Sequence, residues 1–323
     1  MGAAAWRRVA LAAACLALAG CGGGEQAPAG GEYADAVPAA PCVPSQLDDP
    51  AYAAPPGAST TALGPTAAPY ELQAPAGRPR GVALVIHGGG WVGVGTKQLA
   101  AMRPDAARWL ARGWATANVD YRPCGQSLDD VLALHDLIRA RIGPDAPIVA
   151  VGASAGAHLA LMLAVLRPDS VRGVVAMAPP TDPVSLGRET VRDPATGAQT
   201  AQPPRDLAAV WRGAFGDRWL AVSPVRRAAE IRARVLLARA TTDPLIPAAQ
   251  LDEQRDAIRD AHGSAWVRHL ELAPGPVDFP HATVAPAEHD RFVRAEDALA
   301  RPWQDEPPAA PEAFPGWWGA PTG

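Results

Sequence analysis

Short runs of apolar residues, uninterrupted by charge, recur at intervals along the middle of the chain. Runs of this length, bounded by turn residues, are typical of strands in a parallel sheet with both faces covered. The expected strands cover residues 70–72, 81–86, 114–119, 148–151, 171–178, 235–238 and 265–272, of which the first is a short edge strand.

The longer segments between these runs predict helices. In residues 127–139, for example, Leu128, Val131 and Ile138 fall near one face of a helix. The expected helices cover residues 97–111, 127–139, 155–166, 247–261 and 284–299. Buried strands that alternate with helices indicate the α/β class, with a doubly wound and mostly parallel sheet.

One segment breaks this alternation. Residues 179–222 are long, polar and interrupted by proline, and they carry Trp211, Phe215 and Trp219. Insertions of this length in compact domains are often lids or binding loops. We therefore expect residues 179–222 to form a lid insertion after the strand at residues 171–178, with a disordered excursion as the alternative.

Both ends of the chain differ in composition from the expected domain at residues 66–300. Residues 1–20 carry two arginines before a short apolar stretch, which predicts a removable export signal. Residues 21–65 are rich in Gly, Ala and Pro and predict a tether without a core of its own. Residues 301–323 form a tail rich in Pro and Trp, for which we expect disorder rather than docking near the lid.

The end of the signal predicts a lipid anchor. Leu18-Ala19-Gly20-Cys21 resembles the bacterial lipoprotein box, in which the cysteine is lipidated and becomes the first residue. An ordinary secretory signal is the alternative. Either route predicts export to the cell envelope, and lipid on Cys21 would anchor the protein to a membrane. No later apolar run approaches the length of a membrane span.

The net charge and the cysteine content restrict which partners and which cellular compartment are expected. The formal charge of −4 becomes −6 when the two arginines of the signal are removed. This mild acidity, without a basic patch, argues against nucleic acid as a partner. Apart from Cys15 in the signal and Cys21, the chain has only Cys42 and Cys124. This even pair predicts a disulfide in an oxidising compartment.

The stretch Gly152-Ala153-Ser154-Ala155-Gly156 lies between an expected strand and an expected helix. This is the arrangement of a nucleophile elbow, in which a tight turn holds the serine in a strained conformation. Small neighbours leave room for that turn, and the adjacent helix N-terminus favours negative charge beside the serine. An ordinary tight turn is the alternative. The pattern predicts that Ser154 is a nucleophile.

A second motif, His87-Gly88-Gly89-Gly90-Trp91, follows the strand at residues 81–86. Consecutive glycines expose backbone N–H groups that no side chain shields, which suits an oxyanion hole. A flexible glycine turn is the alternative. Further along, Asp243 and His281 each follow an expected strand, in the chain order nucleophile, acid, base.

In this order and in its motifs the sequence resembles the α/β-hydrolase superfamily. It is similar to the esterase branch of hormone-sensitive-lipase-like, feruloyl, acetyl and kynurenine-formamidase-like enzymes. The motifs that carry the resemblance are His87-Gly88-Gly89-Gly90-Trp91, Asp120-Tyr121-Arg122, the elbow with Ala157-His158-Leu159, Ser223-Pro224 and Asp243-Pro244-Leu245-Ile246-Pro247. Two departures are Ala240-Thr241-Thr242, where a glycine usually precedes the acid, and the Pro-rich approach to His281.

The resemblance implies roles for individual residues. Ser154 would be the nucleophile, Asp243 the orienting acid and His281 the base, and His158 would be structural. The oxyanion donors would be the N–H groups of three residues, Gly89, Gly90 and Ala155. His289 lies inside the expected helix at 284–299, too far from the sheet edge to act as the base.

These features predict a carboxylesterase that acts on a small-molecule ester without a metal or other cofactor. An aryl-formamidase or a prolyl-oligopeptidase-like peptidase is the alternative within the fold. A non-catalytic, envelope-binding lipoprotein is the alternative from another class. The seven histidines show no metal-ligand spacing. Acyl and alcohol preference and oligomeric state do not follow from the motifs.

Overall fold

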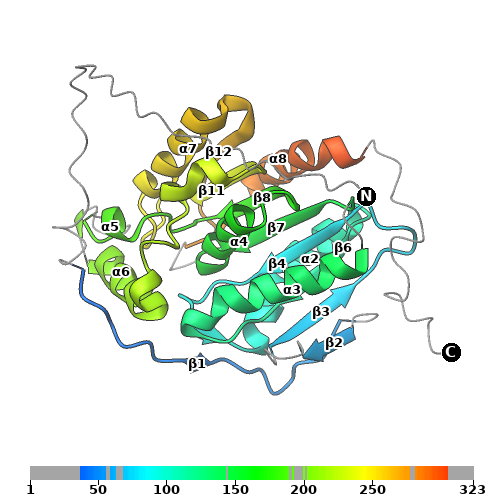
Figure 1. Cartoon of the computed structure of the whole chain (residues 1–323), viewed down its shortest axis with the longest axis horizontal. Coiled ribbons are helices and arrows are strands. Elements are labelled where there is room, and N and C mark those ends of the chain that lie inside the picture. Colours follow the sequence, from blue (N-terminus) through cyan, green and yellow to red (C-terminus); the bar gives the residue numbers. More distant parts are fainter. Residues whose placement is uncertain are drawn as a thin grey trace, which may run out of the picture.

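A computed structural model describes residues 37–55, 59–62, 68–142, 145–188, 191–192, 199–200, 202–276 and 281–304. Its centre is an eight-stranded sheet in the order β12-β11-β8-β7-β4-β6-β3-β2 (Figure 1). The strands β4, β6, β7, β8, β11 and β12 are parallel, and β2 and β3 join one edge in antiparallel pairing. This is the mostly parallel sheet of an α/β-hydrolase fold, as the sequence predicted.

The strands of this sheet are β2 (Ser59–Ala62), β3 (Pro69–Gln73), β4 (Val82–Ile86), β6 (Ala115–Val119), β7 (Ile148–Ala153), β8 (Val171–Met177), β11 (Arg234–Ala240) and β12 (Val267–Leu272). The helices are α2 (Thr96–Ala111), α3 (Ser127–Ile142), α4 (Ala155–Leu166), α5 (Pro183–Leu186), α6 (Gln202–Phe215), α7 (Ala248–His262) and α8 (Pro286–Gln304). Short strands are β1 (Ser45–Gln46), β5 (Gly93–Val94), β9 (Val191–Arg192) and β10 (Gln199–Thr200), and 3-10 turns are η1 (Cys124–Gln126), η2 (Gly216–Arg218), η3 (Val225–Glu230) and η4 (Ser264–Trp266).

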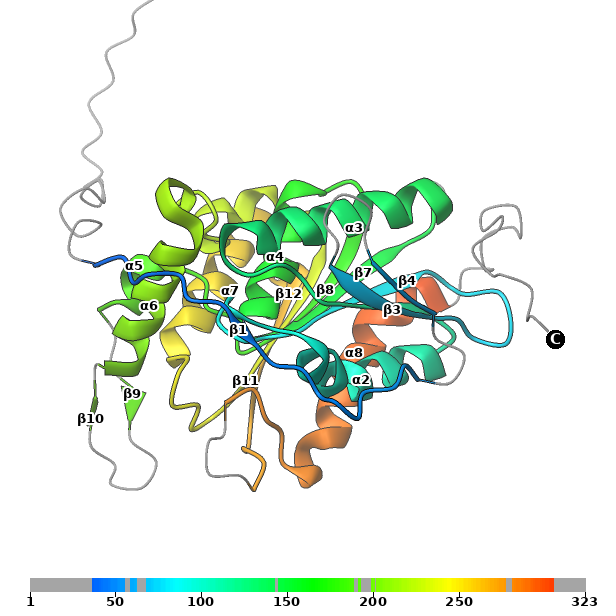
Figure 2. The ribbon, with the colours of Figure 1, turned by 90° about the horizontal axis from the view of Figure 1, so that it is seen from below.

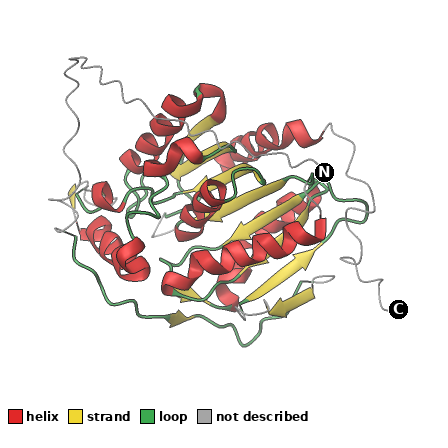
Figure 3. Cartoon of the chain, in the orientation of Figure 1, coloured by secondary structure: helices red, strands yellow, loops and turns green. Residues whose placement is uncertain are grey.

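Helices cover both faces of the sheet, so the central strands are buried on both sides (Figures 2 and 3). The helices α3, α4 and α7 lie on one face, and α2 and α8 lie on the other (Figure 2). Successive side chains of β4 alternate between the two cores: Leu84 and Ile86 pack on the first, Ala83 and Val85 on the second. This two-sided burial explains the uninterrupted apolar runs of the sequence.

The insertion after β8 contains α5 and α6, and α6 is docked on the body. Trp211 of α6 is fully buried, and its ring lies 5.2 Å from that of Trp91 and 4.5 Å from that of His158. The indole N–H of Trp211 donates to the carbonyl of Trp219, 3.1 Å away. The described part of the insertion is therefore a packed element, and the alternative of a disordered excursion is wrong for α6.

The prediction of a tether over residues 21–65 is wrong for residues 37–55. Val37 is buried, the N–H of Ala40 donates to the carbonyl of Ala209 in α6, and β1 pairs in parallel with β5. The chain follows the outside of the body from α6 past β1 (Figure 1). Residues 37–49 are called the N-terminal strap below. Residues 1–36, including the predicted signal and Cys21, lie outside the described residues.

The domain also ends later than expected. Helix α8 continues to Gln304, so residues 301–304 belong to the body rather than to the tail. Residues 305–323 lie outside the described residues. No helix in the described ranges combines the length and apolar character needed to cross a membrane.

Candidate active site

Ser154 lies in a strained turn between β7 and α4. Its backbone angles are φ 54° and ψ −123°, in a region that residues with a side chain rarely occupy. A Cβ on Gly152 would lie 2.2 Å from the carbonyl oxygen of Gly156, and a Cβ on Gly156 would lie 2.1 Å from that of Ile86. Both glycines are therefore required by close backbone contacts, which hold Ser154 at the carboxyl edge of the sheet.

Asp243 follows β11 at the same edge and is 4% exposed. Its Oδ1 accepts hydrogen bonds from the backbone N–H groups of Leu245 and Ile246, each at 2.9 Å. The Nδ1 of His281 lies 2.9 Å from Oδ2 and 3.0 Å from Oδ1 of the same carboxylate. Because a carboxylate only accepts, the imidazole donates from Nδ1 and its orientation is fixed.

The loop that carries Asp243 is held by Arg239, which the sequence analysis did not single out. The guanidinium of this buried residue donates to the carbonyls of Thr241 and Ile246 at 2.9 and 3.0 Å, and to Glu271 at 3.1 Å. The two carbonyls lie on either side of Asp243 in the chain. Arg239 thus fixes a loop that lacks the usual glycine. The available signal was a cation directly after the apolar run at residues 235–238.

The glycine-rich loop after β4 is fixed by Asp120 and Tyr121. Asp120 lies 2.9 Å from Nε2 of His87 and accepts from the N–H of Gly95 at 3.0 Å. The hydroxyl of Tyr121 donates toward the carbonyls of His87 and Gly88, and its ring stacks on His87 at 4.2 Å. Burial raises the pKa of Tyr121 well above its ordinary value, so the phenol stays a donor. Asp120 and Tyr121 of the Asp-Tyr-Arg motif therefore support the loop.

In the glycine-rich loop, the backbone N–H groups of Gly89 and Gly90 point away from the residues that hold the loop in place. Gly89 and Gly90 have φ angles of 110° and 61°, and the carbonyl of Gly89 accepts from the N–H groups of Val92 and Gly93. In a trans peptide the N–H points opposite to the carbonyl. The N–H of Gly90 therefore points away from Gly93, and that of Gly89 points away from Tyr121. A Cβ on Gly88 would lie 3.1 Å from Cβ of Ser154, which shows how closely the loop approaches the elbow.

His158 links the elbow helix to this loop and to the insertion. Its Nδ1 accepts from the indole N–H of Trp91 at 3.0 Å, and its Nε2 donates to the carbonyl of Val222 at 2.7 Å. Burial lowers the pKa of His158 to about 4, which keeps the ring neutral, as both hydrogen bonds require. These contacts support a structural role for His158.

A cavity of about 420 Å³ lies beside Ser154. His281, Gly88 and Gly89 share its lining with Ser154, so the predicted nucleophile and base face one space. His289 is exposed on α8, as expected, but it also lines this cavity, so its description as part of a purely solvated helix face needs correction. Among the described residues, no group of His, Cys, Asp and Glu could hold a metal ion.

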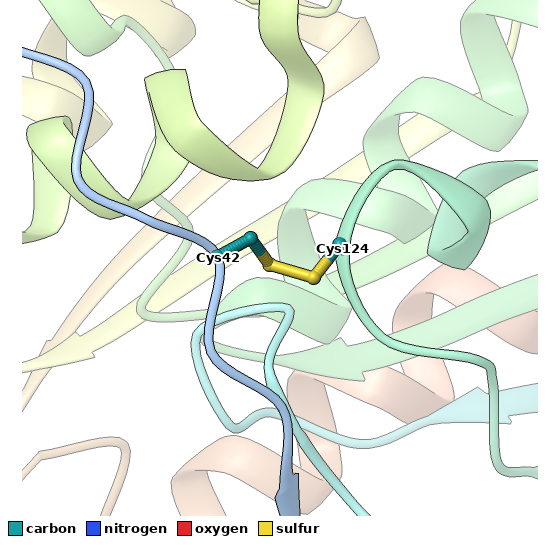
Figure 4. The surroundings of a disulfide bond; sticks show 2 residues. All are labelled: Cys42 and Cys124. Carbon is teal, nitrogen blue, oxygen red and sulfur yellow. A yellow bond between two sulfur atoms is a disulfide. The ribbon is translucent and has the colours of Figure 1, made fainter.

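The N-terminal strap is tied to the region of the glycine loop by a disulfide. Cys42 and Cys124 are bonded, with a Cα–Cα distance of 6.0 Å (Figure 4). The N–H of Cys124 donates to the carbonyl of Trp91 at 2.7 Å, and the N–H of Ser45 donates to the carbonyl of Val92 at 2.8 Å. The pairing expected from the cysteine count is present in the structure, and it braces the segment that follows the three glycines.

Removal of this disulfide is expected to lower the stability of the protein. The bond closes a loop with a sequence separation of 82 residues, so its loss should reduce the free energy of unfolding by about 2–4 kcal/mol. The measurement is urea unfolding of the double variant Cys42→Ser and Cys124→Ser beside wild-type protein. Reduced wild-type protein is the matched control and should unfold at a similar midpoint. Equal midpoints for oxidised wild type and the variant would contradict the prediction.

Comparison with known proteins places this architecture in a family. Residues 71–258 match the BD-FAE family, which is more than half of the chain. The chain belongs to the BD-FAE family. The matched range of this BD-FAE member contains the glycine-rich loop, Ser154 and Asp243, and it ends within α7 before His281.

Solved structures share its fold. Esterase 2 of Thermogutta terrifontis, phosphonylated by sarin, is 17% identical with a TM-score of 0.57, and the match covers 76% of this chain and 94% of that one. A bacterial heroin esterase is 19% identical with a TM-score of 0.57, over 77% and 86% of the two chains. A puromycin-hydrolyzing peptidase of Mycobacterium tuberculosis is 18% identical with a TM-score of 0.58, over 78% and 40%. At these identities the BD-FAE chain shares the α/β-hydrolase fold with them.

Among curated proteins, the chain is similar to part of a non-reducing polyketide synthase, AdrD, of Penicillium roqueforti. The two are 36% identical over 114 residues, which is 30% of this chain. The chain spans 4% of the length of that synthase.

Proposed function

We propose that this protein is a serine hydrolase that cleaves carboxylic esters. The observation that carries the proposal is the arrangement around one cavity: Ser154 in a strained turn, and His281 already oriented by Asp243. A serine hydroxyl is a weak nucleophile unless a base removes its proton, and this arrangement supplies a candidate base of fixed orientation.

In the proposed mechanism, Oγ of Ser154 attacks the ester carbonyl while Nε2 of His281 takes the hydroxyl proton. The imidazolium then protonates the leaving alcohol, and an acyl-enzyme remains on Ser154. In the second step His281 takes a proton from a water molecule, whose oxygen attacks the acyl carbon. The bond between this carbon and Oγ of Ser154 then breaks, the imidazolium returns the proton to Oγ, and the acid is released. The carboxylate of Asp243 stabilises the imidazolium in both steps.

Negative charge develops on the carbonyl oxygen in each tetrahedral intermediate. The proposed donors to this oxyanion are the backbone N–H groups of Gly89, Gly90 and Ala155. Gly89 and Gly90 have the backbone conformation described above, and Ala155 is the first residue of α4, where helical N–H groups lack partners within the helix. The fixed loop requires little reorganisation when charge appears, which is the condition for effective stabilisation.

The test is covalent labelling combined with turnover. Wild-type protein should react with a fluorophosphonate probe, and mass spectrometry should place the adduct on Ser154. The same preparation should hydrolyse p-nitrophenyl acetate. A protein that neither reacts with the probe nor hydrolyses the ester would instead fit the non-catalytic envelope protein considered above. If the protein hydrolysed aryl formamides or peptides in preference to esters, it would be an aryl-formamidase or a peptidase instead.

We further propose that the protein is exported and lipid-anchored at Cys21. The lipoprotein box supports this proposal, and a disulfide suits an oxidising compartment. Val37 already packs on the body and lies 16 positions after Cys21. A fully extended chain of this length spans at most about 55 Å. The anchor would therefore hold the body closer to the membrane than a tether to residue 65 would.

Replacement of the anchor cysteine is expected to change fractionation. Wild-type protein should sediment with membranes and incorporate labelled palmitate, while Cys21→Ser should appear in the soluble fraction or remain uncleaved. Cys15→Ser is the matched control, because that residue lies within the predicted signal, and it should fractionate like the wild type. Identical fractionation of Cys21→Ser and wild type, without palmitate on either, would refute the anchor.

A further inference from the structure

The cavity beside Ser154 extends away from the glycine loop, along α2. This helix and α8 lie on the same face of the sheet (Figure 2). Five residues of α2 at helical spacing line the cavity, namely Gln98, Ala101, Met102, Asp105 and Arg108. The last lies ten positions after the first, which corresponds to about 15 Å along the helix axis. The cavity is therefore elongated. Its Gln98 end is beside the glycine loop and Ser154, because a Cβ on Gly89 would lie 2.8 Å from Nε2 of Gln98, and Arg108 is at the other end.

The middle of this cavity is apolar. Met102 of α2 and Phe292 of α8 contribute to its lining, as do Val151 and Val175 of the sheet, and all four side chains are buried in the core beneath the sheet. Side chains of this kind offer dispersion contacts and no hydrogen bonds. The middle of the cavity is therefore suited to an apolar group of a ligand.

The far end of the cavity is formed by ion pairs. Arg108 contacts Asp105 at 2.5 Å and the buried Glu296 at 3.2 Å, and Arg112 contacts Glu296 and Asp297. Three carboxylates thus meet two guanidinium groups. Burial raises the pKa of Glu296, and even a protonated Glu296 would leave the remaining charges balanced. The end of the cavity has no surplus positive charge that would attract an anion.

We propose that this cavity binds the acyl group of the ester and selects uncharged acyl chains of intermediate length. The inference rests on the proposed esterase function. In the covalent intermediate the acyl group stays attached to Ser154, whereas the alcohol must leave and water must enter. The elongated space between α2 and α8 suits the group that stays. The side of the cavity at His281 and the exposed His289 suits the group that leaves.

The length of the cavity sets the expected chain length. Three bonds of an extended chain advance about 3.5 Å, so about twelve bonds would span the distance from Gln98 to Arg108. An octanoyl chain fits within this distance, and a much longer chain would meet the ion pairs of Arg108. We therefore expect kcat/KM to rise from acetate to octanoate and to fall again for palmitate.

Ala101 offers a test that leaves the core intact. It lines the cavity about one helical turn beyond Gln98, yet as a residue it is exposed, so a larger side chain can be accommodated without repacking. Ala107 is the matched control, because it is exposed on the same helix and does not line this cavity. The variants are Ala101→Phe and Ala107→Phe.

The measured quantity is the ratio of kcat/KM for p-nitrophenyl octanoate to that for p-nitrophenyl acetate. Ala101→Phe should lower this ratio at least about tenfold, the effect of blocking several methylene contacts in an apolar pocket. Ala107→Phe should keep the wild-type ratio within about twofold. The same ratio in both variants would overturn the inference. Hydrolysis of the acetate ester by wild type tests the proposed function separately, so the two failures are distinguishable.

Two further substrate series test the acyl assignment and the charge preference. Ala101→Phe should not change the ratio between octyl acetate and ethyl acetate; a tenfold fall there would move the alcohol into the cavity and overturn the assignment. Wild type should hydrolyse the p-nitrophenyl hexanoate at least about tenfold faster than the mono-p-nitrophenyl ester of adipic acid, because the ion pairs at the far end of the cavity leave no surplus positive charge for a terminal carboxylate. Equal rates would contradict the preference for uncharged chains.

Discussion

Purified Ser154→Ala is expected to fold like the wild type and to lose at least about three orders of magnitude in kcat for p-nitrophenyl acetate. The substitution removes only the hydroxyl oxygen, and alanine keeps the Cβ that the turn already accommodates in Ser154. The residual rate should reflect the oxyanion donors and substrate binding alone. Circular dichroism and thermal unfolding establish the fold, and initial rates establish the loss.

Ser170 provides a matched control for this experiment. Its Oγ lies 2.7 Å from Nε2 of His135, whose Nδ1 lies 2.9 Å from Asp136, so these residues form a second Ser–His–Asp contact. This contact precedes β8, whereas Ser154 follows β7, and the two serines therefore lie at opposite edges of the parallel sheet. Ser170→Ala should keep wild-type turnover and probe labelling. If Ser170→Ala lost labelling and Ser154→Ala kept it, the nucleophile would be Ser170 at the opposite edge, and the role proposed for Ser154 would be wrong.

His281→Ala is expected to reduce kcat on the same scale as Ser154→Ala, because no other group would then accept the serine proton. The comparison is His289→Ala. Both rings line the cavity, but it is the imidazole of His281 that bonds to Asp243, at 2.9 Å. His289→Ala should therefore reduce kcat by less than about tenfold. The reverse order of the two effects, with both variants folded, would transfer the role of base to His289.

Much of the fold followed from local sequence patterns. A strand with covered faces needs apolar residues at successive positions, and a helix needs its apolar residues at helical spacing, so both signals lie within a few residues. The expected helix at residues 155–166 matches α4, and most other boundaries agree within a few residues. The elbow was also visible, because its requirement for glycines two residues on either side of Ser154 is local.

The contacts that assemble the candidate site were less predictable from the sequence. Asp243 and His281 were expected from their order along the chain, but their hydrogen bond joins residues 38 positions apart. The contribution of Arg239 depends on where the carbonyls of Thr241 and Ile246 point. The support of the glycine loop by Asp120 likewise depends on two strands that become neighbours in the sheet.

The sequence alone therefore determined the α/β class, the order of the main elements and the position of the elbow at Ser154, because each of these is encoded by neighbouring residues. The tertiary structure alone decided that residues 37–49 pack on the body, although their composition resembles a tether. Backbone pairing of β1 with β5 and the disulfide of Cys42 hold them there, and neither depends on apolar spacing. The cavity between α2 and α8 was decided in the same way. Its walls come from helices and strands far apart in the chain, and only their packing creates the space.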